Sequence, residues 1–401
     1  MKKAIILFMI FGFVFSKNNY PIVFIHGFLG WGTNEMGNYN YWGGNNNICD
    51  SLRSEGYTIF EVSVGPISSN WDRAIEAFYQ IKGGQVDYGS GHSKEHKIIQ
   101  KPKGKFYEGL YPQWNHENPI HIIGHSMGGQ TARVLNYLLT NVIYVDSLGK
   151  NKESSILLGE INNNWVYSIS TISTPHNGIT LLDHVNKTFP FIQYFIGLAG
   201  VIGTDFYNFD LEQWGFSKIK NESWSKYLER IRQHYAWGTR NISSWDLSLI
   251  GAKEINNYAI LKNDVYYFSI STSITKKNIK NDWHSPQKDA SLLIQARARI
   301  IGKRKGYWED GLETDSTWYE NDGLVNTVSM DGPKTGINGP ELIVPFQKDM
   351  ELLSGRWYSI GPLIMDHWNI IGHKLNLKNI DDQSIQFYKD HAQRLMSLTK
   401  K

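Results

Sequence analysis

Apolar positions follow two different periods along the chain. Short runs rich in apolar and β-branched residues, typical of buried strands, cover residues 20–28, 57–64, 120–123, 165–172 and 265–271. Apolar residues at helical spacing mark residues 70–81, 132–139 and 384–398. Strands that alternate with helices favour an α/β domain with a mostly parallel central sheet flanked by helices. We therefore expect one such domain over residues 17–401.

Two long segments interrupt this alternation. Residues 83–109 are rich in Gly, His and Lys and show no clear period, so we interpret residues 83–117 as a loop insertion. Residues 181–209 are apolar and aromatic, yet Pro190 and several glycines break them. A movable lid tolerates such breakers, so we expect a lid insertion over residues 176–215. The alternative is a buried helix pair without motion.

The N-terminus resembles an export signal. Lys2 and Lys3 precede an apolar run over residues 4–15, and Ser16 follows that run. The run is shorter than the roughly 20 residues that span a bilayer. We expect cleavage of residues 1–16 and a secreted mature chain without a transmembrane segment; the alternative is an uncleaved anchor.

Composition narrows the partners further. The formal charge of +3 over 401 residues is small, and we expect no nucleic-acid partner. Cys49 is the only cysteine, so an intrachain disulfide is impossible and the core, with or without a metal, must hold the chain together. The sequence does not indicate the oligomeric state.

A candidate nucleophile lies between a predicted strand and a predicted helix. The stretch Gly124-His125-Ser126-Met127-Gly128 matches the G-x-S-x-G pattern in the strand-turn-helix context that gives the pattern its meaning. Such a turn holds the serine hydroxyl out at the edge of the sheet, at a helix N-terminus where unpaired N–H groups stabilise negative charge. We predict that Ser126 is a nucleophile; the alternative is a chance match.

The first predicted strand ends in His26-Gly27-Phe28. In hydrolases with this serine turn, one N–H of the oxyanion hole follows an early strand and the other follows the serine. The two donors would be the backbone N–H groups of Phe28 and Met127. The alternative for His26-Gly27 is an ordinary turn between strand and loop.

A serine hydroxyl needs a base to remove its proton and a third group to orient that base. The chain order for this turn is serine, acid, histidine. His367 is the best base because it is late in the chain and follows an apolar, extended run. Asp322, in a tight turn, is the preferred acid. Asp366 is its main competitor, but adjacent residues point in different directions, so Asp366 is poorly placed to hold the ring of His367.

The chain resembles the secreted bacterial triacylglycerol lipases of the staphylococcal and thermophilic bacillus group. The stretches that carry the resemblance are residues 26–32, 64–73, 83–89, 121–133, 174–178 and 320–333. The resemblance implies an α/β-hydrolase fold, a triad of Ser126, Asp322 and His367, and a lid over about residues 180–206.

The resemblance also implies a structural zinc held by two aspartates and two histidines. Asp72, His92 and Asp246 match the family's ligands, and His96 is the nearest candidate for the fourth. Such mixed ligation fits a closed tetrahedral zinc site. Calcium is not expected, because the corresponding positions would be Asn369 and Lys374, and a lysine repels a cation.

The function predicted from these residues is hydrolysis of triacylglycerol esters at a lipid–water interface through an acyl-enzyme intermediate. A phospholipase or an acyltransferase on the same triad is a close alternative, because fold and triad do not select the leaving group. The alternative from another class is a secreted binding protein that has the hydrolase fold without catalysis.

Overall fold

The computed structural model describes most of the chain outside the N-terminal segment and the expected lid. The described residues are 18–143, 153, 155–184, 212–214, 221–223, 225–226, 229, 234–288, 290–373 and 382–400. The predicted signal peptide, residues 1–16, and most of the lid predicted over residues 176–215, namely residues 185–211 and 215, lie outside them. No helix among the described residues is long and apolar enough to cross a membrane.

A seven-stranded sheet forms the centre of the molecule, with strand order β10-β11-β7-β6-β5-β1-β2. Its strands are β1 (Ile22–Ile25), β2 (Ile59–Val62), β5 (Ile120–His125), β6 (Val166–Ile172), β7 (Tyr266–Ser273), β10 (Ile343–Pro345) and β11 (Trp357–Ile364). Every neighbouring pair in this sheet is parallel, which confirms the predicted parallel architecture. All residues of β1, β5, β6 and β7 are buried, as expected for strands covered on both faces.

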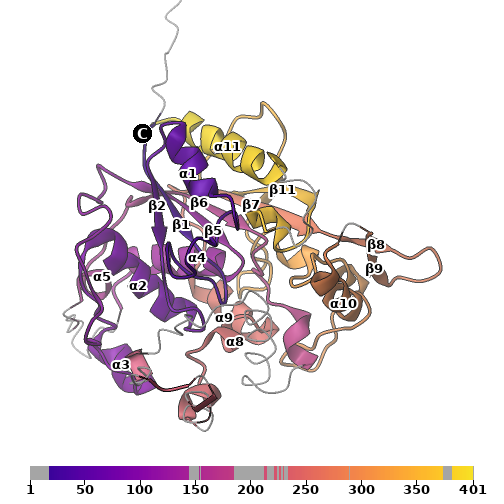
Figure 1. Ribbon diagram of the computed structural model, residues 1–401, viewed down its shortest axis with the longest axis horizontal. Coiled ribbons are helices and arrows are strands. Elements are labelled where there is room, and N and C mark those ends of the chain that lie inside the picture. The colour runs from indigo at the N-terminus through magenta and orange to yellow at the C-terminus, as the bar shows by residue number, and fades with distance from the viewer. Residues whose placement is uncertain are drawn as a thin grey trace, which may run out of the picture.

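Helices cover both faces of the sheet (Figure 1). On one face, α2 (Asn70–Lys82) packs against α4 (Met127–Leu139), which contacts β1, β5 and β6. On the other face, α1 (Ile48–Ser54) packs against α11 (Asp382–Ser397). The hydroxyl of Ser69 accepts the Asp72 N–H and caps α2 at its first turn. The other described helices are α3 (Ser90–His96), α5 (Ile156–Gly159), α8 (Ser243–Asp246), α9 (Leu249–Tyr258) and α10 (Leu292–Ile301).

Two small two-stranded sheets lie in segments without a periodic pattern. β3 (Gly84–Gln85) pairs with β4 (Phe106–Tyr107), and β8 (Thr275–Lys277) pairs with β9 (His284–Pro286), both antiparallel. The sequence predicts an irregular loop over residues 83–117 and predicts no strand over residues 275–286. Strands of two or three residues are too short to show an alternating pattern, which explains the difference.

A buried neutral histidine makes a folded protein less stable as the pH falls, and His121 is such a residue. Burial lowers the pKa of His121 to about 3, while its ring bonds Ser168 Oγ at 2.7 Å and Asn18 Oδ1 at 2.9 Å. The unfolded chain binds a proton below its ordinary pKa of 6.5 and the folded chain does not, so stability is lost as pH falls from 6.5 toward 3.

We therefore expect His121→Gln, which keeps polar atoms for both partners but does not titrate, to flatten this loss. Between pH 7 and pH 5 the free energy of unfolding should fall in both proteins. The fall should be smaller in the variant than in the parent by about 2 kcal/mol. Urea denaturation at pH 7, 6 and 5 measures the difference. Parallel pH profiles for the two proteins would contradict the assignment of a neutral His121.

Candidate active site

The turn at Ser126 has the geometry predicted from the G-x-S-x-G pattern. Strand β5 ends at His125, helix α4 begins at Met127, and Ser126 between them has φ 54° and ψ −127°. A Cβ atom at Gly124 would lie 2.4 Å from the backbone of Gly128, and one at Gly128 would lie 2.2 Å from the Ile25 carbonyl oxygen. Only glycine fits these two positions, and their close packing holds the serine in its strained conformation.

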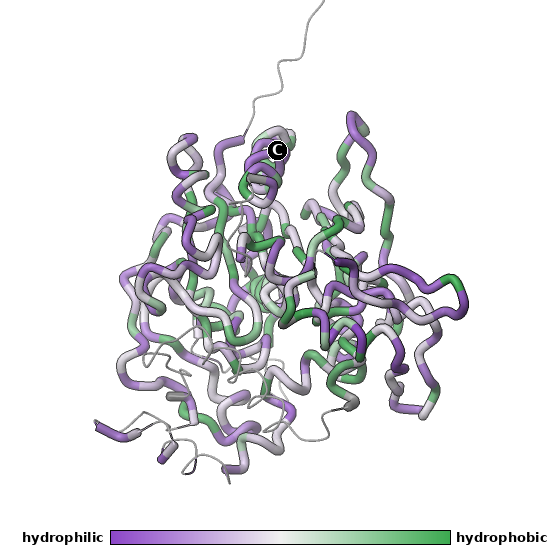
Figure 2. The backbone as a smooth tube through the Cα atoms, turned by 45° about the vertical axis from the view of Figure 1, so that its right-hand side comes forward, coloured by the Kyte–Doolittle hydropathy of each residue, from purple (hydrophilic) through white to green (hydrophobic). Residues whose placement is uncertain are grey.

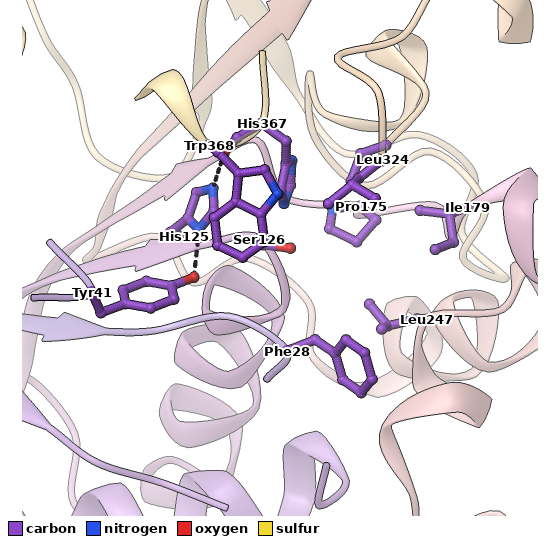
Figure 3. Close-up of a pocket in the computed structure, with 11 residues that line it drawn as sticks. Phe28, Tyr41, His125, Ser126, Pro175, Ile179, Leu247, Leu324, His367 and Trp368 are labelled. Atoms are coloured by element: carbon purple, nitrogen blue, oxygen red, sulfur yellow. Dashed lines mark hydrogen bonds between the residues drawn. The ribbon is translucent and has the colours of Figure 1, made fainter. Parts of the chain in front are cut away.

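The side chain of Ser126 opens into a pocket at the carboxyl edge of the sheet (Figure 3). The lining is mostly apolar and comes from well-separated parts of the chain: Phe28, Tyr41, His125, Ser126, Pro175, Ile179, Leu247, Leu324, Val325, His367 and Trp368. An apolar pocket with a few polar groups at one end suits a ligand that has an apolar body and one polar reacting group.

The structure brings Asp322 and His367 together at the side of this pocket. Nδ1 of His367 lies 2.7 Å from Oδ2 of Asp322, and the His367 backbone N–H donates to the Asp322 carbonyl at 3.1 Å. The other carboxylate oxygen, Oδ1, accepts the N–H groups of Leu324 at 3.0 Å and Val325 at 2.8 Å. Thr272 Oγ1 donates to Oδ2 at 2.9 Å. The carboxylate oxygens are thus held by Leu324, Val325 and Thr272 as well as by the imidazole, so the carboxylate can fix one imidazole tautomer.

The competing carboxylate, Asp366, binds backbone N–H groups instead of the imidazole. Its Oδ1 accepts the N–H groups of Trp368 and Asn369 at 3.0 and 2.8 Å, and its Oδ2 accepts the Ser291 N–H at 3.4 Å. Burial raises the pKa of Asp366. Its contacts are those of a carboxylate that shapes the chain around His367 rather than one that orients the ring.

Ser126 and His367 face the same pocket, and Figure 3 shows the imidazole turned toward the serine hydroxyl. Within the described residues, no hydrogen bond joins Ser126 Oγ to His367. Catalytic pairs are often longer than hydrogen-bond distance before substrate binds. Both side chains are almost fully buried, Ser126 with 8% and His367 with 3% of its surface exposed.

The predicted oxyanion donors lie on either side of the serine. Met127 is the first residue of α4, where a backbone N–H has no partner within the helix. Phe28 follows Gly27, and a Cβ atom at Gly27 would lie 2.8 Å from Ser126 Cβ. This close approach brings the backbone after β1 against the serine. Arg73 holds this backbone in place, because its buried guanidinium donates to the carbonyl oxygens of His26 and Gly27.

A series of hydrogen bonds connects the backbone at Gly27 to the backbone of His367. The Gly27 N–H donates to Tyr41 Oη at 2.8 Å, and Tyr41 Oη lies 2.7 Å from His125 Nδ1. His125 Nε2 lies 3.1 Å from the His367 carbonyl oxygen, which can only accept, so Nε2 carries the proton and Nδ1 accepts from the tyrosine. Burial, followed by the nearby His367 and His373, lowers the pKa of His125 well below its ordinary value, which keeps this ring neutral.

Tyr41→Phe should therefore slow a reaction at Ser126 without weakening substrate binding. The change leaves the Gly27 N–H without its acceptor and frees the His125 ring, so we expect kcat on a soluble ester to fall about tenfold, or about 1.4 kcal/mol, with little change in KM. Tyr39→Phe is the matched control, because the Tyr39 hydroxyl contacts His373 instead. Equal kcat values for the two variants would contradict this role.

The predicted metal ligands lie near one another at the N-terminal end of α2. His92 Nε2 lies 2.7 Å from Asp72 Oδ1, and the rings of His92 and His96 are 4.5 Å apart. Burial, and then the neighbouring Asp72 carboxylate, raises the pKa of Asp246 to about 8. Across the described ranges, no group of three or more His, Cys, Asp or Glu side chains is arranged so that it could hold a metal ion. The donor types fit zinc, since a cation would offset the repulsion between the two buried carboxylates.

Sequence reasoning missed two residues that shape this site. Tyr41 and Thr272 contact the site only through the fold, and no motif or spacing marks them. Thr272 lies near the end of β7, a strand whose residues are all buried, so the alternation of its side chains does not single out Thr272.

Comparison with known proteins gives consistent results across the chain. A family model described as "Lipase-like, C-terminal domain" matches residues 18–400. Lipase 2 of Staphylococcus aureus (strain N315) is 34% identical over 367 residues, which is 88% of this chain and 50% of that protein. The chain thus spans about half the length of the curated relatives it matches.

Solved structures resemble the fold closely. EstA from Clostridium botulinum has a TM-score of 0.87 and 35% identity, covering 98% of this chain and 90% of its own. Lipase 1 from Pelosinus fermentans has a TM-score of 0.82 and 36% identity, covering 96% and 100%. Staphylococcus hyicus lipase has a TM-score of 0.78 and 30% identity, covering 96% and 97%.

Proposed function

The chain belongs to the family of lipase-like C-terminal domains, and from this premise we propose that it hydrolyses carboxylic esters of triacylglycerols through Ser126, His367 and Asp322. The observation that carries the proposal is the meeting in one apolar pocket of a strained serine and a histidine held by a buried carboxylate.

Each residue has a separate task in the proposed reaction. His367 removes the proton from Ser126 Oγ as this oxygen attacks the acyl carbonyl carbon. The N–H groups of Phe28 and Met127 donate to the oxygen that becomes negative, and His367 returns the proton to the departing alcohol. Water, activated by the same imidazole, then cleaves the acyl-enzyme and regenerates the hydroxyl. Asp322 keeps the proton of the neutral ring on Nδ1, so Nε2 is free to accept.

The pocket lining supports an acyl substrate. Ile179, Leu247 and Leu324 give the serine an apolar surrounding that a lipid chain would fill and a polar substrate would not. Hydrolysis rates across triacylglycerols and phospholipids of increasing acyl length test the proposal. A higher rate on phospholipid would favour the phospholipase alternative, transfer of the acyl group to an added alcohol would favour an acyltransferase, and no turnover of any ester would favour a binding protein.

Zinc is proposed as a structural ion, held by Asp72, His92, His96 and Asp246. Such an ion would cross-link α2, α3 and the segment at α8 and would take no part in the ester chemistry. We expect purified protein to contain about one zinc per chain and His92→Ala to contain less, with a melting temperature several degrees lower. Elemental analysis and calorimetry measure both quantities. Equal zinc content in the two proteins would rule out His92 as a ligand.

Secretion is proposed from residues 1–16 alone, because that segment has the charge and the apolar run of an export signal. N-terminal sequencing of protein collected from the culture medium tests the cleavage position. A chain that keeps Met1 and stays with the cells would contradict the proposal.

A further inference from the structure

The β8–β9 hairpin carries no residue of the proposed catalytic machinery. Its two strands leave the body of the molecule directly after β7, and Figure 1 shows the hairpin projecting beyond α10. Lys277 pairs with His284 at the last rung, so residues 278–283 form the outer loop.

The outer loop of this hairpin carries two exposed apolar side chains. Ile279 is 104% exposed and Trp283 is 44% exposed. Figure 2 shows the outer end of the hairpin as a green segment between purple flanks. An isoleucine that is completely exposed buries no apolar surface within the chain, so its transfer into an apolar medium is favourable.

Positive charge surrounds these two side chains. Between residues 275 and 286 the sequence has three lysines and one aspartate, and Lys277 pairs with that aspartate, Asp282, at 2.6 Å. Lys276 and Lys280 are exposed and form no ion pair with any residue that the structure describes. Nζ of Lys303 lies 5.2 Å from the centre of the Trp283 ring and adds a further positive charge beside the indole.

The base of the hairpin is bonded to the turn that holds the candidate acid. The Ile274 N–H donates to the Asn321 carbonyl at 3.0 Å, and the Asn321 N–H donates to Thr275 Oγ1 at 3.1 Å. Asn321 immediately precedes Asp322. Because β5 and β7 belong to one parallel sheet, the hairpin leaves from the same edge as Ser126. A surface that receives the hairpin therefore lies on the side of the molecule where the pocket is found.

We propose that the β8–β9 hairpin anchors the protein to a lipid surface that carries anionic head groups. Ile279 and Trp283 enter the interfacial layer, and Lys276 and Lys280 stay at the level of the head groups. The exposed isoleucine favours a lipid surface over a soluble polyanion, which would bind the lysines alone. The purpose of this anchor would be to deliver ester substrate, and that purpose rests on the proposed function. Binding of the hairpin to the lipid surface does not depend on it.

Vesicle cosedimentation of the inactive Ser126→Ala chain tests the anchor without lipid hydrolysis. The probes are vesicles of equal phosphatidylcholine and phosphatidylglycerol, vesicles of phosphatidylcholine alone, and heparin as a soluble polyanion. Ile279→Ser should weaken binding to the anionic vesicles about tenfold. Lys276→Gln with Lys280→Gln should weaken it about 25-fold, and far less for phosphatidylcholine alone.

Matched controls use exposed residues elsewhere on the molecule. Ile337→Ser removes another highly exposed isoleucine, and Lys103→Gln with Lys348→Gln removes two other exposed lysines. Both controls should bind anionic vesicles as the parent does. In chains that keep Ser126, all hairpin variants should hydrolyse a soluble short-chain ester at the parent rate, which shows that they are folded.

Unchanged vesicle binding by Ile279→Ser would overturn the proposal. So would binding to heparin that depends on Lys276 and Lys280 while Ile279→Ser has no effect on any probe, since the hairpin would then be a polyanion site. If the parent chain hydrolysed no ester yet bound anionic vesicles through Ile279, the proposed function would fail and the anchor would stand.

Discussion

Ser126→Ala should lower kcat for ester hydrolysis about a million-fold and leave substrate binding nearly unchanged. The reason is that Oγ forms the covalent bond to the acyl group. Among the described residues that line the pocket, the only other hydroxyl is that of Tyr41, which is hydrogen-bonded to Gly27 and His125. Turnover of a chromogenic short-chain ester, with the protein at high concentration, gives the residual rate.

Ser173→Ala is the matched control. Ser173 has the same left-handed backbone, with φ 50° against 54° for Ser126, but it does not line the pocket. Its hydroxyl bonds Thr272 at 2.7 Å, one step away from Asp322, so we expect less than a tenfold loss. If Ser126→Ala retained a rate within a hundredfold of the parent, Ser126 would not be the nucleophile.

Asp322→Asn should lower kcat about ten-thousand-fold while the chain stays folded. Two backbone N–H groups, those of Leu324 and Val325, hold Oδ1, so the amide oxygen of an asparagine would occupy that position. Its NH₂ group would then face His367 Nδ1 and donate to it. The ring would carry its proton on Nε2, where it cannot accept the proton of Ser126.

Asp366→Asn separates this effect from a general loss of a buried carboxylate. Asp366 is also buried and accepts backbone N–H groups, but it does not touch the imidazole. We expect its kcat to stay within about tenfold of the parent, with any loss appearing as lower stability. Similar kcat losses for the two variants would show that the acid is not specifically Asp322.

The candidate residues at the centre of the site could be chosen from the sequence because they are local or ordered along the chain. The turn at Ser126 needs only five consecutive residues, and the glycines at 124 and 128 can be assigned from the backbone they must adopt. His367 and Asp322 could be selected from chain order and turn chemistry. The parallel sheet followed from β-branched runs separated by helical spacing, since both faces of these strands are buried.

Other features depend on contacts that no local pattern encodes. Tyr41, which accepts from Gly27, contacts His125 across 84 residues, and Thr272 donates to Asp322 across 50. The β8–β9 hairpin has strands of only three residues, and its exposed Ile279 would be predicted as core from hydropathy alone. The proposed metal ligands could be named only by resemblance, because they are spread over residues 72–246 without a recognisable spacing.

Covalent labelling by an organophosphonate ester is the most direct measurement of the central claim, that His367 and Asp322 make one serine reactive beside two backbone N–H groups. Peptide mass spectrometry should find a single adduct, on Ser126, formed much more slowly in His367→Ala and absent in Ser126→Ala. An adduct on another residue, or an unchanged rate of labelling without the imidazole, would contradict the account.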